Sequence, residues 1–354
     1  MPSVKRLSII ALVILLLLLS APVIALFMLG HSEAALRYAV AQLPTKTGSL
    51  ERLQVENVRG TLAGGFTAER IVIEHDLVFL SIEGVRGRLE LLPLLWQTID
   101  VSDLEIANLK IESRPRNQPP PTEAKPFLPR LLTLEARQLR IRQSTVTPLT
   151  GASVVFDEVT AHGTIRERRI WIRDAKGSIG NIALEAEGIL KAAMPLGLEA
   201  QATATFASRR GPRWVAKVST DGDLERLPLK GGLIEPFIAE LDEASLRALP
   251  PWNLRGQAKV SKLDFTRFGG SDFFGDIDGE LSLDFDSAGY RAVGSLDSPG
   301  LGAGPVEVEF DGTFARNVLR AKMLKLSHAP SRLRIDTSGT VTFEEMGPAL
   351  ALSG

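Results

Sequence analysis

The residues of this chain that could most readily bind a metal ion or take part in catalysis are two pairs of aspartates and four histidines. Asp276 and Asp278, like Asp284 and Asp286, are two residues apart, so each pair lies on one face of a strand. Calcium binding is one use for such carboxylates, and solvated charges on the wet face of a strand are the interpretation we favour. The histidines are scattered, without a second metal ligand at a useful spacing: His31, His75, His162 and His328. We therefore expect no metal site.

Common catalytic motifs are missing from the sequence. It contains no H-E-x-x-H, no G-x-x-x-x-G-K and no G-x-S-x-G. The glycine-rich segment 300–304 is bracketed by Pro299 and Pro305, which favours a turn over a phosphate-binding loop. We therefore expect neither catalytic residues nor a cofactor, and an enzyme with an unrecognised site is only the third hypothesis considered below.

The composition excludes further classes of protein. The 354 residues carry 41 basic and 42 acidic side chains and no basic stripe, so nucleic acid is not an expected partner. There is no cysteine, which excludes disulfides and thiolate chemistry. The fold must be held by burial and backbone hydrogen bonds.

An uncharged apolar run fills residues 7–29. At 1.5 Å per residue it spans roughly 34 Å as a helix, enough to cross a bilayer core. Lys5 and Arg6 precede it, so the positive-inside rule places residues 1–6 in the cytoplasm and the rest of the chain across the membrane. We predict a single-pass membrane protein with most of its chain on the far side of the membrane from the cytoplasm.

A cleavable signal peptide is the alternative interpretation of this run. Its core would be residues 7–19, with the processing region at 20–22. Pro22 would then follow the cut directly, and the apolar run is longer than a signal needs, so we favour an uncleaved anchor. Beyond it, Ser32 is a suitable cap for a juxtamembrane helix over residues 32–43.

From residue 50 onward, apolar residues alternate with charged or small ones, and glycines punctuate the runs. This period of two predicts strands with one apolar and one wet face, about 17 of them in a long antiparallel meander. We expect the charged alternates, such as Glu105 and Arg140, to face water. The apolar residues that we expect on the inner face are Leu104, Ile106, Leu109, Ile111, Leu134, Leu139, Ile141, Leu198, Leu281, Leu283, Phe285, Val308, Phe310, Leu333 and Ile335.

Two stretches depart from this alternation. Residues 114–129 carry six prolines and read as an exposed loop or polyproline spacer. Residues 234–249 place Phe237, Leu241 and Leu246 at helix-like spacing and end before a proline pair, which predicts a short helix. This helix would either plug an apolar face or simply cover core.

Four motifs in this order resemble one known family. They are GTLAGGFT at 60–67, LELLPLLW at 89–96, IDVSDLEI at 99–106 and LPPWNLRG at 249–256. Together with the preceding anchor, they resemble the N-terminal portion of TamB-like proteins, the inner-membrane subunits of the translocation and assembly module, within the AsmA-like family. The resemblance extends from the anchor to about residue 343.

The resemblance implies a mainly β fold: one transmembrane helix, then an elongated antiparallel sheet over residues 50–354, curled into a U-shaped apolar groove, with one or two short helices. It also implies a location in the inner membrane with the bulk of the chain in the periplasm, phospholipid movement toward the outer membrane and support of outer-membrane biogenesis. TamB-like proteins are usually several times longer and engage their outer-membrane partner, TamA, through a C-terminal domain that these residues do not include.

Three functional hypotheses follow from the sequence. The first is a groove that carries phospholipid, because an apolar sheet face this long needs a cover and the expected helices are too few. The second is a scaffold that binds outer-membrane polypeptides by strand addition along an open edge. The third is an enzyme. We favour the first.

Overall fold

The computed structural model describes residues 28, 30–41, 50–75, 78–114, 132–147, 153–191, 196–207, 211–248, 252–268, 271–286, 289–315, 318–344 and 347–353. The strands are β1 (Leu50–Glu56), β2 (Arg59–Thr61), β3 (Gly65–His75), β4 (Val78–Glu90), β5 (Thr98–Ser113), β6 (Thr133–Thr147), β7 (Val154–Phe156), β8 (Val159–Arg166), β9 (Arg169–Ile179), β10 (Ile182–Lys191), β11 (Gly197–Phe206), β12 (Trp214–Asp223), β13 (Leu227–Glu235), β14 (Ile238–Arg247), β15 (Asn253–Asp264), β16 (Asp276–Asp286), β17 (Tyr290–Asp297), β18 (Val306–Ala315), β19 (Val318–His328), β20 (Leu333–Glu344) and β21 (Gly347–Ser353). The helical segments are α2 (Glu33–Ala41) and the 3₁₀ turns η1 (Leu92–Trp96), η2 (Phe265–Phe268), η3 (Asp272–Phe274) and η4 (Pro299–Leu301).

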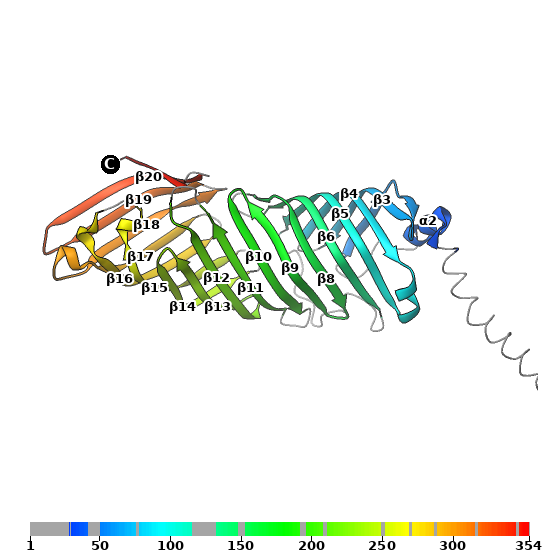
Figure 1. The fold of residues 1–354 in the computed structure, drawn as a ribbon, viewed down its shortest axis with the longest axis horizontal. Helices are drawn as coiled ribbons and strands as arrows, with labels where there is room; N and C mark the ends of the chain where they lie inside the picture. Colours follow the sequence, from blue (N-terminus) through cyan, green and yellow to red (C-terminus); the bar gives the residue numbers. More distant parts are fainter. Residues whose placement is uncertain are drawn as a thin grey trace, which may run out of the picture.

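All the described strands belong to one long, curved and open sheet, so the expectation of a mainly β fold is confirmed. Strands follow one another as hairpins along the long axis of the molecule (Figure 1). The described chain has 21 strands, more than the 17 expected. Typical of the connections is the two-residue turn between β9 and β10, where Gly180 adopts φ 56°, a conformation that glycine accepts without strain.

One pair of strands departs from the expected antiparallel order. β5 and β6 are parallel, with Thr98 beside Thr133 and Glu112 beside Thr147. A parallel pair requires a crossover connection, because the chain must return from the end of β5 to a position level with the start of β5 before β6 begins. The sequence between these strands contains the proline-rich stretch 114–129, which lies outside the described residues apart from Arg114.

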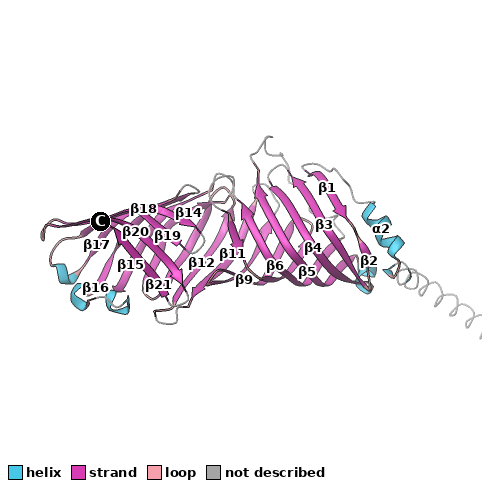
Figure 2. Cartoon of the chain, turned by 90° about the horizontal axis from the view of Figure 1, so that it is seen from above, coloured by secondary structure: helices cyan, strands magenta, loops and turns pink. Residues whose placement is uncertain are grey.

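The described helical segments sit at the two ends of the sheet. α2 lies beside the N-terminal strands, and η2 to η4 lie near β16 and β17 at the other end (Figure 2). α2 begins where expected, and Ser32 Oγ accepts a hydrogen bond from the Ala35 amide at 3.3 Å, as an N-cap does. Nearly all of the apolar run 7–29 lies outside the described residues, and within the described part no helix has the length and hydropathy to cross a bilayer.

The helix predicted over residues 234–249 is wrong, because that segment contains the strand β14. Residues 242 and 243 form a β-bulge, where β14 has one residue more than each neighbouring strand. In a regular strand, Leu241 and Leu246 would point to opposite faces, since they are five positions apart. The bulge returns them to one face. The resulting apolar spacing imitates that of a helix.

Candidate functional site

The register of the sheet joins most of the predicted apolar residues on one face. Residues paired across neighbouring strands point the same way, so a face can be followed from strand to strand. Leu104 is beside Leu139 on β6, and Ile141 is beside Val159 on β8. Continued through every pair to β20, this defines the apolar face. Its predicted members are Leu104, Ile106, Leu134, Leu139, Ile141, Leu198, Leu281, Leu283, Phe285, Val308, Phe310, Leu333 and Ile335.

Leu109 and Ile111, the other two predicted members, belong to a second apolar patch. They are beside Ile82 and Leu80 on β4, at the far end of the same strands. One row of residues across these strands, at Gly84 and its neighbours, lacks regular β pairing. This row separates the second patch from Ile106. Gly84 has φ 63°, so the regular pleat is interrupted there.

β-bulges keep the apolar face continuous where the sequence pattern slips. Asp174 on β9, Glu243 on β14 and Lys262 on β15 have φ between 49° and 56°, and each lies at a register shift. Each bulge absorbs one extra residue, so the apolar residues before and after it share a face. At the bulge on β15, the Lys262 amide donates a hydrogen bond to Asp278 at 3.0 Å.

The opposite face is charged, and its charges pair across strands. Arg142 contacts Glu105 at 2.5 Å, and Arg140 contacts Glu158 at 3.1 Å. Both arginines lie on β6, the strand that carries Leu139 and Ile141 on its other side. These exposed pairs each contribute little free energy, but they keep this face wet. The amphipathic character of the sheet is therefore maintained strand by strand.

An ion pair between a buried carboxylate and a largely exposed guanidinium joins the start of β5 to β6. The Asp100 side chain is only 2 % exposed and contacts the guanidinium of Arg137. Asp100, through a hydrogen bond and its charge, raises the pKa of Arg137 above its usual range. Nothing in the sequence indicated this pair, since the two residues come from strands that the proline-rich stretch separates.

The apolar face is only partly buried. Ile106 and Ile141 are each 7 % exposed, whereas Ile172 is 43 % and Ile335 is 40 % exposed. Most other members are half-buried. Because the described helical segments lie at the ends of the sheet, none of them covers this face (Figures 1 and 2). The described part of the chain thus leaves a long apolar surface accessible.

Two depressions lie on the charged face over β9 to β13. Their volumes are about 420 and 720 Å³. Acidic and basic groups line them, among them Glu187, Lys217 and Lys230. The larger one also has apolar residues in its lining, Trp171 and Ile189 among them, so the presence of charged groups is what distinguishes it from the apolar face.

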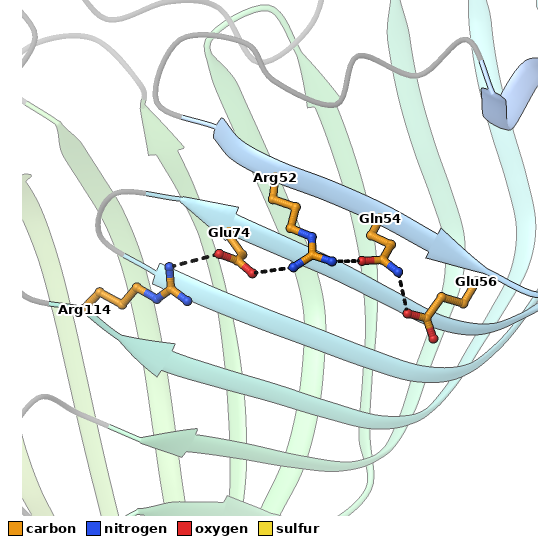
Figure 3. Close-up of polar contacts among 5 residues, drawn as sticks. All are labelled: Arg52, Gln54, Glu56, Glu74 and Arg114. Atoms are coloured by element: carbon orange, nitrogen blue, oxygen red, sulfur yellow. Dashed lines mark hydrogen bonds and ion pairs between the residues drawn. The ribbon is translucent and has the colours of Figure 1, made fainter.

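The two edges of the sheet differ in chemistry. Near the β1 edge, Arg52 and Arg114 contact Glu74 at 3.7 and 3.5 Å, and Gln54 accepts a hydrogen bond from Arg52 and donates one to Glu56 at 2.8 Å (Figure 3). Charged edges discourage the addition of further strands. β21, which pairs with β20, contains no charged residue. Among the described strands, charge therefore marks the β1 edge and is absent from β21.

The candidate chemical residues have structural partners. His328 is fully buried, with Nδ1 2.7 Å from Ser331 Oγ and Nε2 3.1 Å from the Gly304 carbonyl. Asp286 accepts a hydrogen bond from the Gly289 amide at 3.0 Å in a turn. Within the described ranges, no group of acidic residues and histidines is arranged to hold a metal ion.

No protein-family model, curated protein or solved structure matches this chain. The resemblance to TamB-like proteins therefore stays an expectation, and a function must be argued from the residues. What the fold defines is an open amphipathic sheet with one continuous apolar face.

Proposed function

We propose that this chain is an inner-membrane-anchored periplasmic protein that carries phospholipid toward the outer membrane. In this proposal, the curved sheet forms a U-shaped groove, and the apolar face lines it. The continuity of the apolar face from β5 to β20 carries the proposal. Soluble proteins rarely leave so large an apolar surface without a partner.

The length and chemistry of the apolar face suit acyl chains. At 4.7–4.9 Å between strands, the face extends for roughly 65–70 Å, well beyond the 30 Å core of a bilayer. Each acyl methylene sheltered from water gains about 0.8 kcal/mol. Partial shelter along the sheet therefore offsets the cost of removing a lipid from a membrane, while headgroups stay in water.

Two features of the sequence support this location and direction. The run 7–29 is long enough for an anchor, and it precedes the strands at which the apolar face begins. The resemblance to TamB-like proteins implies the same arrangement. It also adds a TamA-like outer-membrane protein as a partner to be tested.

Photo-crosslinking in cells tests the proposal. A crosslinking amino acid at Leu139 or Leu283 is expected to give phospholipid adducts, because both residues lie on the apolar face. The matched controls are Arg140 and Asp284, the next residues along the same strands, which point to the charged face. Equal lipid adducts at all four positions, or none at Leu139 and Leu283, would contradict the proposal.

Strand addition is the second candidate function. The observation in its favour is β21, an uncharged strand that pairs with β20 and with no other described strand, so an extended polypeptide could join it through backbone hydrogen bonds. The same crosslinker at Ala351, an exposed residue of β21, separates the two: adducts with β-barrel precursors there, and no lipid adducts at Leu139 and Leu283, would favour a scaffold. The β1 edge, with its charged cluster, is expected to bind no such strand.

A further inference from the structure

The turn η1 presents an unusual group of exposed apolar side chains. Leu92 is 59 %, Leu95 is 42 % and Trp96 is 73 % exposed. We call these three residues the η1 cluster. A connection between two strands is normally polar, and isolated exposed leucines are common, but three large apolar side chains in five residues mark an interaction site.

η1 is a well-defined turn. Pro93 fixes the backbone at its start, and Gln97 ends it in the left-handed conformation, with its amide donating a hydrogen bond to the Leu94 carbonyl at 3.0 Å. The exposure of the η1 cluster is therefore built into an ordered element. It is not a side effect of a loose loop.

The structure fixes η1 beside the residue that directly follows the apolar run 7–29. The side chain of Leu91 packs against Gly30 so closely that a methyl group on Gly30 would lie 2.3 Å from Leu91 Cδ1. The Gly30 carbonyl accepts a hydrogen bond from the Ala63 amide at 3.0 Å. Met28, inside the run, is itself 70 % exposed. The end of the run and the η1 cluster thus share one end of the molecule.

We propose that the η1 cluster inserts into the surface of the bilayer that the run 7–29 enters, and that its partner is lipid. A chain that crosses a membrane over residues 7–29 leaves the hydrocarbon at Gly30, so η1 is held at the level of the headgroups. Tryptophan is enriched there, and leucine side chains reach the acyl boundary. This contact seats the N-terminal end of the sheet on the membrane at a second point.

This inference rests on the membrane anchor of the proposed function, but it goes beyond that function because it does not need lipid to move along the sheet. A chain of any function with this anchor and this turn would make the same contact. If the proposed function is also correct, the contact brings β4 and β5, where the apolar face begins, to the lipid surface.

Site-directed spin labelling tests the proposal directly, since the chain has no cysteine to replace. The full chain, reconstituted in vesicles of phosphatidylethanolamine and phosphatidylglycerol, carries one nitroxide at position 92, 95 or 96. The matched control is position 273, because Phe273 is 57 % exposed on another 3₁₀ turn, at the opposite end of the sheet (Figure 2). We expect several-fold higher accessibility to oxygen than to a water-soluble nickel complex at the η1 cluster, and the reverse at 273.

A second measurement uses the unlabelled chain. Lipids brominated along their acyl chains are expected to quench part of the tryptophan fluorescence, and Trp96→Phe is expected to remove that part. Labels at the η1 cluster as water-accessible as the one at 273 would overturn the proposal. Labels protected from both reagents would also overturn it, because they would indicate a protein partner or a second copy of the chain. A chain that does not float with the vesicles would overturn it as well. Missing lipid adducts at Leu139 and Leu283 would overturn only the proposed function.

Discussion

Deleting Glu243 is expected to be tolerated, whereas deleting Ser245, two residues away in the same strand, is expected to destabilise the sheet. Glu243 is the extra residue of the bulge on β14, with φ 49°. Without it, Leu241 and Ala244 are two residues apart, and β14 pairs regularly with β13 and β15. The apolar face is kept.

The magnitudes follow from the residues involved. Removing Glu243 removes a left-handed residue that costs about 1 kcal/mol, against some loss from flattening the strand, so the stability should stay within about 1 kcal/mol of the parent. Removing Ser245 turns Leu246 to the wet face and puts Arg247 on the apolar face. There it would lie beside Leu227, which is 1 % exposed. A displaced leucine and a charge in apolar surroundings together cost about 3 kcal/mol or more.

Urea unfolding and hydrogen exchange of peptides from β13 to β15 measure these effects. The deletion of Glu243 should leave the urea midpoint and the amide protection close to those of the parent chain. The deletion of Ser245 should lower both. Similar losses in the two variants would refute the reasoning, because the bulge would then do more than absorb one residue to keep the face continuous.

Three other predictions concern single side chains. Leu283→Arg places a charge on the apolar face at β16, so crosslinks to lipid should fall at Leu333 and persist at Leu139; Ser282→Arg, on the charged face, should leave both unchanged. Leu227→Ala should lower the free energy of unfolding by about 2–5 kcal/mol, whereas Ile234→Ala, at a 46 % exposed position on the same strand, should change it by less than about 0.5 kcal/mol in urea titrations. Burial beside Phe285 and Phe310 raises the pKa of Tyr290 to about 12. The folded state therefore holds this proton more tightly than the unfolded chain does, so its stability is complete below pH 10 and falls as the pH rises through about 12. Spectrophotometric titration should show a tyrosinate transition near pH 12, and Tyr290→Phe should abolish it.

Local pattern was sufficient for most of the sheet. Alternation identifies strands because each carries its own two faces, and most predicted apolar residues indeed share one face in register. The exceptions depend on residues that are distant in the sequence. The pattern around Leu241 and Leu246 has two interpretations until the partners of β14 are known, because a bulge is a mismatch between strands.

The parallel pairing of β5 with β6 was also beyond the sequence argument. Alternation gives the faces of a strand and says nothing of its direction, so Ile106 and Ile141 looked the same in either orientation. The Asp100–Arg137 pair depends on this pairing and was missed with it. One of the two ring nitrogens of His328 likewise contacts the Gly304 carbonyl, 24 positions away, and no local signal reveals this contact.

Because most contacts in this fold are between neighbouring strands, the length of the sheet can change without disturbing distant parts. Each described strand makes most of its contacts with the strands it pairs with, as in repeat proteins. Gain or loss of one hairpin would alter the long dimension by about 9–10 Å, twice the strand spacing, and leave distant parts intact. The length of the sheet can therefore change in fixed increments through the duplication or loss of hairpins.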